Sequence, residues 1–175
     1  MSMRNAVLLA ALAFCADAAF AAEGPNLGRV ATQEDIAAFD ISIAPDGAGL
    51  PAGRGTPKEG EAVFAGKCLG CHGEKGAGKP NDALVGGRET LVGEQPAIKT
   101  VGSYWPYATT IFDYVRRAMP LNAPRSLSNE ETYAVVAYLL HLNGVIGEND
   151  AIDAQSLPNV RMPNRDGFST FSPGK

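Results

Sequence analysis

Two cysteines and a histidine stand close together in the stretch KCLGCHGEKGAG, which runs from residue 67 to residue 78. Cys68 and Cys71 are separated by two residues, and His72 follows the second cysteine directly. Three kinds of site use such residues: a covalently attached haem, a zinc site, and a thiol–disulfide pair. The rest of the chain has to discriminate between them.

The first 22 residues are organised like a secretory signal peptide. Arg4 supplies the positive charge, residues 6–16 are apolar, and Ala19-Phe20-Ala21 resembles a cleavage site. The apolar stretch is too short to span a membrane, so we expect a periplasmic chain with no membrane span after cleavage. Cleavage removes Cys15 and leaves the two cysteines of the motif. A lipid anchor on Cys15 is the alternative, and the bulky Phe14 before it disfavours that alternative.

The surroundings of the motif favour haem. A disulfide between Cys68 and Cys71 would close a very short loop and add little stability, and a redox pair needs a βαβ setting that the sequence does not show. A zinc site would need Cys68, Cys71, His72 and His141 together, and two adjacent ligands reach one tetrahedral ion poorly. A haem of the c type uses all three motif residues: the two thiols add to its vinyl groups, and His72 becomes an axial ligand of the iron.

Composition excludes some other functions. Among the 175 residues, 45% are hydrophobic and 19% are charged, which is typical of a globular protein with a core. The net charge is −4 without long charged blocks, whereas nucleic-acid binding usually needs a basic face. We therefore expect no nucleic-acid partner. The 20 glycines and 12 prolines predict long irregular segments.

Capping signals and apolar periodicity predict three helices. The first begins with the capping box Thr56-Pro57-Lys58-Glu59 and runs toward Cys68. The second covers residues 106–118. The third begins at Ser128, where Glu131 completes another capping box, and ends at Asn143-Gly144. A glycine-rich loop between the first two helices can wrap a flat cofactor or serve as a flexible connector.

The flanks of these helices contain few regular signals. In residues 23–55, a short helix from Thr32 to Phe39 and a turn at Pro45-Asp46-Gly47 are predicted. In the tail, residues 148–175, a short helix near residues 151–155 is predicted. We treat both flanks as arms, which either dock on a partner or form disordered linkers.

The order of these features resembles a class I cytochrome c. A helix leads into C-x-x-C-H, a second helix ends in Met-Pro, and the last helix contains YLLHL. The resemblance implies an all-α class I cytochrome c fold over residues 56–147, with extended N- and C-terminal arms. It also implies that Gly60 lies where the first and last helices cross, with Phe64 facing Tyr138.

Longer strings resemble the cytochrome subunits of sulfane dehydrogenases, which serve a molybdenum enzyme of bacterial sulfur oxidation, and related sulfite dehydrogenase cytochromes. These strings are LGRVATQEDIAAFDISIAPDGAGLPAGRGT, KTVGSYWPYATTIFDYVRRAMP and MPNRDGF. The resemblance implies a molybdenum-containing dehydrogenase subunit and a small carrier cytochrome as partners. The arms would dock on the molybdenum subunit.

Two departures from that family stand out. Its cytochrome subunit usually carries a second haem domain, whereas this chain has one C-x-x-C-H motif and so resembles the first haem domain. The family also commonly has a proline whose carbonyl holds the haem histidine. Asp82 occupies that position here, and any residue's carbonyl can accept the same hydrogen bond.

The distal iron ligand has three candidates. Met119 ends the second helix and precedes Pro120, Met162 lies in the tail, and His141 lies in the last turn of the third helix. We expect Met119, because a thioether at a helix end can be held rigidly against the opposite haem face. A haem with His72 and Met119 as ligands suits electron transfer. An open sixth position would instead suit a peroxidase-like enzyme, and a free soluble carrier is a further alternative.

Overall fold

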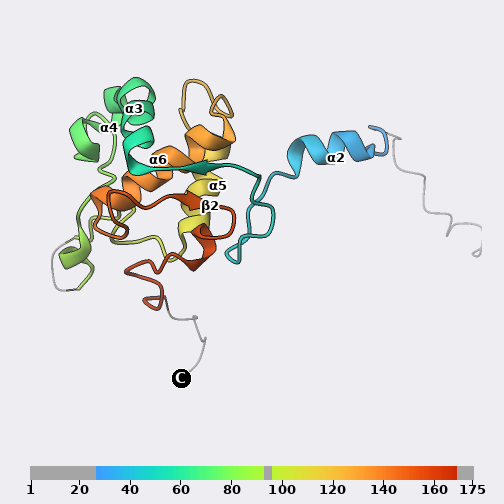
Figure 1. Cartoon of the computed structure of the whole chain (residues 1–175). Helices are drawn as coiled ribbons and strands as arrows, with labels where there is room; N and C mark the ends of the chain where they lie inside the picture. The colour runs from blue at the N-terminus through green and yellow to red at the C-terminus, as the bar shows by residue number, and fades with distance from the viewer. Residues whose placement is uncertain (1–26, 93–95, 169–175) are drawn as a thin grey trace, which may run out of the picture. The chain divides into compact units, whose positions relative to one another are not determined.

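The computed structural model describes residues 27–92 and 96–168 (Figure 1). Contacts divide the chain into two units, one ending at Phe39 and one beginning at Asp40. The predicted signal peptide, residues 1–22, lies outside the described residues. In the described part, no helix has both the length and the apolar character needed to cross a membrane.

The second unit is built mainly from helices. The longer ones are α3 (Pro57–Lys67), α5 (Ala108–Ala118) and α6 (Asn129–Leu142), and the single turn α4 (Leu69–His72) follows α3. Short 3₁₀ turns are η2 (Glu74–Gly76), η3 (Arg88–Leu91) and η4 (Leu157–Asn159). The predicted all-α fold is confirmed.

Both predicted capping boxes are present. At the start of α3, Thr56 Oγ1 accepts a hydrogen bond from the Glu59 N–H, and the Glu59 carboxylate accepts one from the Thr56 N–H at 2.8 Å. Ser128 and Glu131 repeat this arrangement at the start of α6. The second helix, predicted to start near Pro106, begins at Ala108, because Tyr107 keeps an extended backbone and α5 begins after it.

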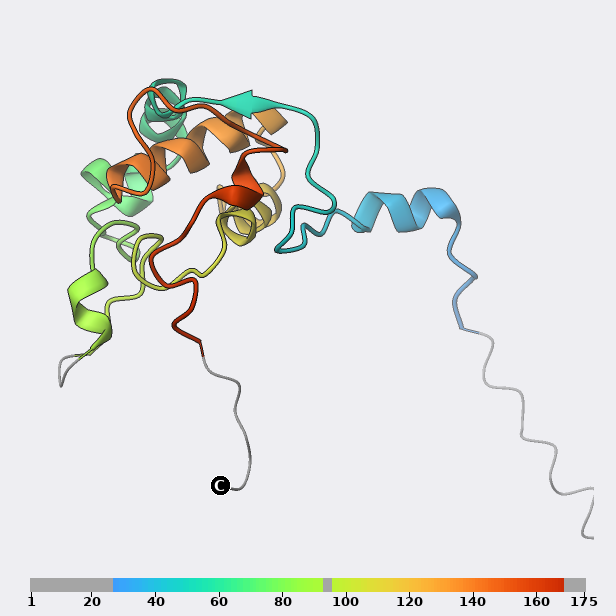
Figure 2. The same ribbon diagram turned by 60° about the horizontal axis from the view of Figure 1, so that its bottom comes forward.

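Helix α6 is the centre of the core, and α3 crosses it (Figure 2). The Phe64 and Tyr138 rings meet at the crossing with their centroids 5.5 Å apart, as the resemblance implied. Lys67 at the end of α3 pairs with Glu131 at the start of α6, with 2.7 Å between Nζ and Oε1. The Lys67 hydrogen bond lowers the pKa of Glu131 below its ordinary value.

Gly60 permits the close approach of α3 and α6. A Cβ at this position would clash with the Ala134 carbonyl and lie 2.8 Å from the Tyr138 Cβ. We expect Gly60→Ala to lower the free energy of unfolding by about 3 kcal/mol or more, because neither backbone can move without displacing a helix.

Gly66 is the matched control in the same helix, since it is exposed and a Cβ there meets nothing within 4 Å. We expect Gly66→Ala to stabilise the protein by about 0.5–1 kcal/mol. Thermal unfolding followed by circular dichroism measures both effects. Equal stability of the two variants would contradict the crossing described above.

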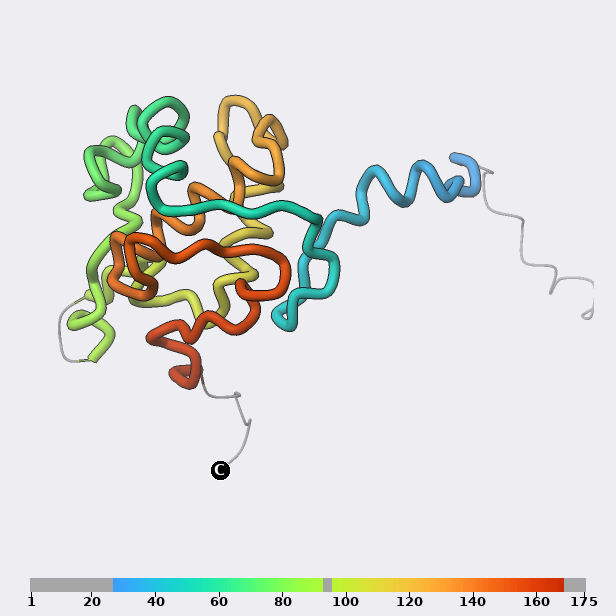
Figure 3. Tube along the Cα trace, viewed as in Figure 1, coloured from blue at the N-terminus to red at the C-terminus, as the bar shows by residue number. Residues whose placement is uncertain are grey.

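The two arms meet in a short antiparallel ladder. Strand β1 (Arg54–Gly55) pairs with strand β2 (Ile152–Asp153), with Arg54 opposite Asp153. The two segments run side by side in the Cα trace (Figure 3). The helix predicted near residues 151–155 was therefore wrong. Ile152 is extended and buried, and the Asp153 carboxylate accepts the N–H groups of Gln155 and Ser156 in a turn.

Residues 40–55 pack against the helical core. The Ile43 N–H donates to the buried Asp113 carboxylate at 2.9 Å, and the Tyr133 hydroxyl donates to the Pro51 carbonyl at 2.9 Å. The Ile43 side chain itself is buried. Much of the stretch 23–55 is thus part of the second unit.

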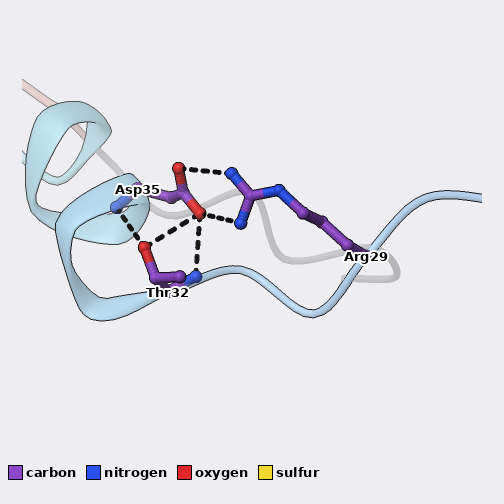
Figure 4. Close-up of polar contacts among 3 residues, drawn as sticks. All are labelled: Arg29, Thr32 and Asp35. Carbon is purple, nitrogen blue, oxygen red and sulfur yellow. Dashed lines mark hydrogen bonds and ion pairs between the residues drawn. The ribbon is translucent and has the colours of Figure 1, made fainter.

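The described part of the first unit contains α2 (Gln33–Phe39), as the sequence predicted. Asp35 accepts hydrogen bonds from the Thr32 N–H and from both ends of the Arg29 guanidinium (Figure 4). The hydrogen bond from Arg29 and, to a smaller extent, those from Thr32 lower the pKa of the Asp35 carboxyl to about 2. No residue of α2 is buried, and the Phe39 side chain is 79% exposed.

Candidate functional site

A cavity of about 510 Å³ opens among α3, α4, α5 and α6 in the second unit. Cys68, Cys71, His72 and Met119 all line it, so the fold brings the four predicted site residues together. Most of the remaining wall is apolar and comes from Phe64, Leu84, Val101, Ile111, Val115, Leu127, Val135 and Leu139. A largely apolar cavity with a few polar groups suits a flat, mostly hydrophobic cofactor.

Both thiols stand on the turn that follows α3. Cys68 caps the end of α3, and the N–H groups of Cys71 and His72 both donate to the Cys68 carbonyl, at 3.1 and 3.0 Å. This turn places the cysteines and the histidine along one side of the cavity. The two cysteines are not bonded to each other. Burial raises the pKa of the Cys68 thiol to about 11, whereas a redox-active cysteine needs a lowered pKa.

The imidazole of His72 is held by a backbone carbonyl. Its Nδ1 lies 3.0 Å from the Asp82 carbonyl oxygen, at the position where the resemblance to the family led us to expect a proline. With Nδ1–H donating to that oxygen, Nε2 is the nitrogen left for an iron. Such a contact fixes the tautomer and the ring orientation of a metal-binding histidine.

Met119 lies at the end of α5, where its N–H donates to the Val115 carbonyl at 3.1 Å. Neither of the alternative ligands is among the described residues that line the cavity. Met162 is 1% exposed and belongs to the hydrophobic core, and Nδ1 of His141 is buried without a hydrogen-bond partner. Of the three candidates, Met119 is the one that lines the cavity in the described part of the chain, and its binding to iron stays a prediction.

One aromatic residue of the wall, Tyr114, was not assigned to the site from the sequence. Trp105 and Tyr114 both line the cavity, with ring centroids 6.0 Å apart. Trp105 comes from the loop before α5, and Tyr114 lies on the face of α5 opposite most of its buried residues. The apolar periodicity of the helix marked other positions as buried, so it did not indicate that Tyr114 lines a cavity.

The donor set agrees better with haem than with zinc. Among residues 27–92 and 96–168, no three His, Cys, Asp or Glu side chains are grouped closely enough to hold a metal ion. One imidazole and one thioether both line an apolar cavity, and two thiols lie at its edge. This combination fits a covalent haem with two axial ligands.

Comparisons with known proteins agree with this geometry. The family model "Cytochrome c" matches residues 57–143. A chain in the crystal structure of the sulfane dehydrogenase SoxCD from Paracoccus pantotrophus is 40% identical, with a TM-score of 0.76, and the match covers 83% of this chain and 71% of that one. This chain belongs to the cytochrome c family. Membership implies a covalently bound haem c, and the class I fold predicted from the sequence is confirmed.

A second relative comes from another sulfur-metabolising system. A thiosulfate dehydrogenase from Allochromatium vinosum is 29% identical over 121 residues, or 67% of this chain. The cytochrome spans 39% of the length of that curated relative. Both relatives belong to proteins that are named as dehydrogenases of sulfur compounds.

Proposed function

We propose that this cytochrome is a periplasmic electron-transfer subunit with a single haem. It accepts electrons from a molybdenum-containing sulfane or sulfite dehydrogenase subunit and passes them to a small carrier cytochrome. The observation that carries the proposal is the 40% identity to a chain of the sulfane dehydrogenase SoxCD over most of both chains. The predicted signal peptide supports the periplasmic location.

The cavity residues have separate roles in this proposal. Cys68 and Cys71 would anchor the haem, and His72 and Met119 would hold its iron. The haem supplies one-electron chemistry, and the protein supplies the ligands and the apolar surroundings that set its potential. If His72 and Met119 both held the iron, peroxide would have no place to bind there, which argues against a peroxidase-like enzyme.

The test of this function follows the haem spectrum. The oxidised cytochrome is mixed with the purified molybdenum subunit and then with sulfite or a protein-bound sulfane. We expect the reduced haem bands to appear with one of these substrates, and not when the substrate or the molybdenum subunit is omitted. A haem that stays oxidised with both substrates, or peroxidase turnover by the cytochrome alone, would contradict the proposal.

We further propose that the segment around α2 docks on the dehydrogenase subunit. The apolar side chains Leu27, Val30, Ile36 and Phe39 are all exposed, and α2 has no buried residue. A seven-residue helix with no buried residue is marginal in water. A partner surface that covers these side chains would stabilise it.

Deleting residues 27–39 is expected to leave the haem spectrum unchanged and to weaken binding to the molybdenum subunit at least about tenfold, because exposed apolar contacts are lost. Titration calorimetry measures the affinity. A longer deletion through residue 50 serves as the contrast, since it removes the buried Ile43 and is expected to lower the stability of the haem domain as well. Unchanged affinity of the shorter variant would rule out docking through α2.

A further inference from the structure

The side chain of Asn143 joins the end of α6 to a distant segment of the glycine-rich loop. Its Nδ2 donates to the Leu84 carbonyl at 3.1 Å and to the Leu139 carbonyl at 2.8 Å. Its Oδ1 accepts from the Gly86 N–H at 3.1 Å. The sequence pattern at Asn143-Gly144 predicted a helix end, and three hydrogen bonds from one amide are more than a helix end requires.

The segment that Asn143 holds includes the carbonyl that orients His72. Two backbone hydrogen bonds flank Asp82. The Asn81 N–H donates to the Cys71 carbonyl at 2.9 Å, and the Leu84 N–H donates to the Gly76 carbonyl at 2.8 Å. Both hydrogen bonds connect the residues around Asp82 to the loop that contains the haem motif. Asn143 adds the connection to the buried core helix α6.

The surroundings of the Asn143 amide are closely packed. A Cβ at Gly102 would collide with the Asn143 Oδ1, so the loop before α5 closes over the amide. Thr100 Oγ1 donates to the Gly86 carbonyl at 2.5 Å, and the N–H of the same Gly86 donates to Asn143 Oδ1. The amide therefore has little freedom to adopt another hydrogen-bonding arrangement.

We propose that Asn143 is a positioning residue for the axial histidine. By fixing Leu84 and Gly86 to α6, it holds the Asp82 carbonyl at hydrogen-bonding distance from His72 Nδ1. That hydrogen bond makes the imidazole a stronger electron donor to the iron and so stabilises ferric iron. This inference rests on the proposed role of His72 as the axial ligand.

The experiment uses the full haem-loaded chain with Asn143→Ala. Loss of the three hydrogen bonds lets the Asp82 carbonyl move, so the reduction potential is expected to rise. The His72 ring N–H is expected to exchange with solvent at least about tenfold faster, as measured by NMR on the reduced protein.

The control is Tyr133→Phe, which removes a different hydrogen bond from the same helix, the one to the Pro51 carbonyl. It is expected to lower stability by about 1 kcal/mol and to leave both the potential and the exchange rate unchanged. This variant separates a general loss of stability from an effect on His72.

A second variant, Asn143→Asp, keeps an acceptor for the Gly86 N–H and loses the two Nδ2 donations. Its added negative charge acts on the potential by itself, so the exchange rate is the measurement for this variant. It is expected to raise the exchange rate of the His72 ring N–H as Asn143→Ala does, and it decides the question if Asn143→Ala does not fold. If the folded variants carry a full complement of haem and keep the wild-type potential and exchange rate, the positioning role of Asn143 is overturned and the proposed function is not. Absence of covalent haem from the wild-type chain would instead contradict the proposed function.

Discussion

Replacing both Cys68 and Cys71 by alanine is expected to abolish covalent haem attachment completely. The thioether bonds have no other possible origin in the cavity, because these two thiols are the ones that line it. After denaturation, acidified organic solvent should extract haem from the double variant and leave it on the wild-type chain. Absorbance of the two phases measures the distribution.

The single variants sharpen this test, since each should retain attachment through one thioether and show a shifted absorption band of the reduced haem. Cys15→Ala is the matched control, because this cysteine lies in the predicted signal peptide. It should have no effect on attachment. Haem that leaves the wild-type polypeptide under the same conditions would show that the motif does not carry a covalent haem.

Replacing Met119 by alanine is expected to remove the distal iron ligand. The weak near-infrared band that reports sulfur bound to ferric iron should disappear, and the reduced protein should bind carbon monoxide. The reduction potential should fall, because a methionine ligand raises it. Spectra of the oxidised, reduced and carbon monoxide-treated forms measure these changes.

Met162 provides the comparison within the same chain. This side chain is buried in the hydrophobic core, away from the cavity wall. Met162→Leu conserves volume and is expected to keep the near-infrared band at a cost of less than about 1.5 kcal/mol in stability. If Met162→Leu lost the band and Met119→Ala kept it, the assignment of the distal ligand would be reversed.

The contact between His72 and Asp82 explains how the site tolerates an unusual residue. Where related cytochromes commonly have proline, this chain supplies the same carbonyl oxygen from an aspartate, at 3.0 Å from the imidazole. The hydrogen bond depends on the position of the backbone rather than on the side chain. Substitution of Asp82 is therefore less informative about the haem site than substitution of Asn143, which helps to fix that backbone.

The arms show why a composition rich in glycine and proline is a poor guide to packing. Residues 40–55 have almost no regular structure, yet Ile43 is buried and Pro51 accepts a hydrogen bond from Tyr133 of α6. Strand β1 finds its partner in β2, almost a hundred residues later along the chain. Such pairings depend on which surfaces the helices leave open, and local sequence signals carry no information about that.

By itself, the sequence determined the features that depend on neighbouring residues. The capping boxes at Thr56 and Ser128 require partners three residues away, and the C-x-x-C-H motif places both thiols and the imidazole on one turn. Helical periodicity likewise predicted that Met119 ends the helix before Pro120. Local chain geometry is sufficient for all of these.

The tertiary structure alone decided which distant groups meet. It selected Met119 over Met162 and His141 for the cavity wall, added Tyr114, and placed the Asp82 carbonyl on His72. It also brought the Asn143 amide to the glycine-rich loop. These contacts join segments that are far apart in the sequence and are not linked by any repeat or regular spacing. The positions of the segments are set by the close packing of α3, α5 and α6 around the cavity.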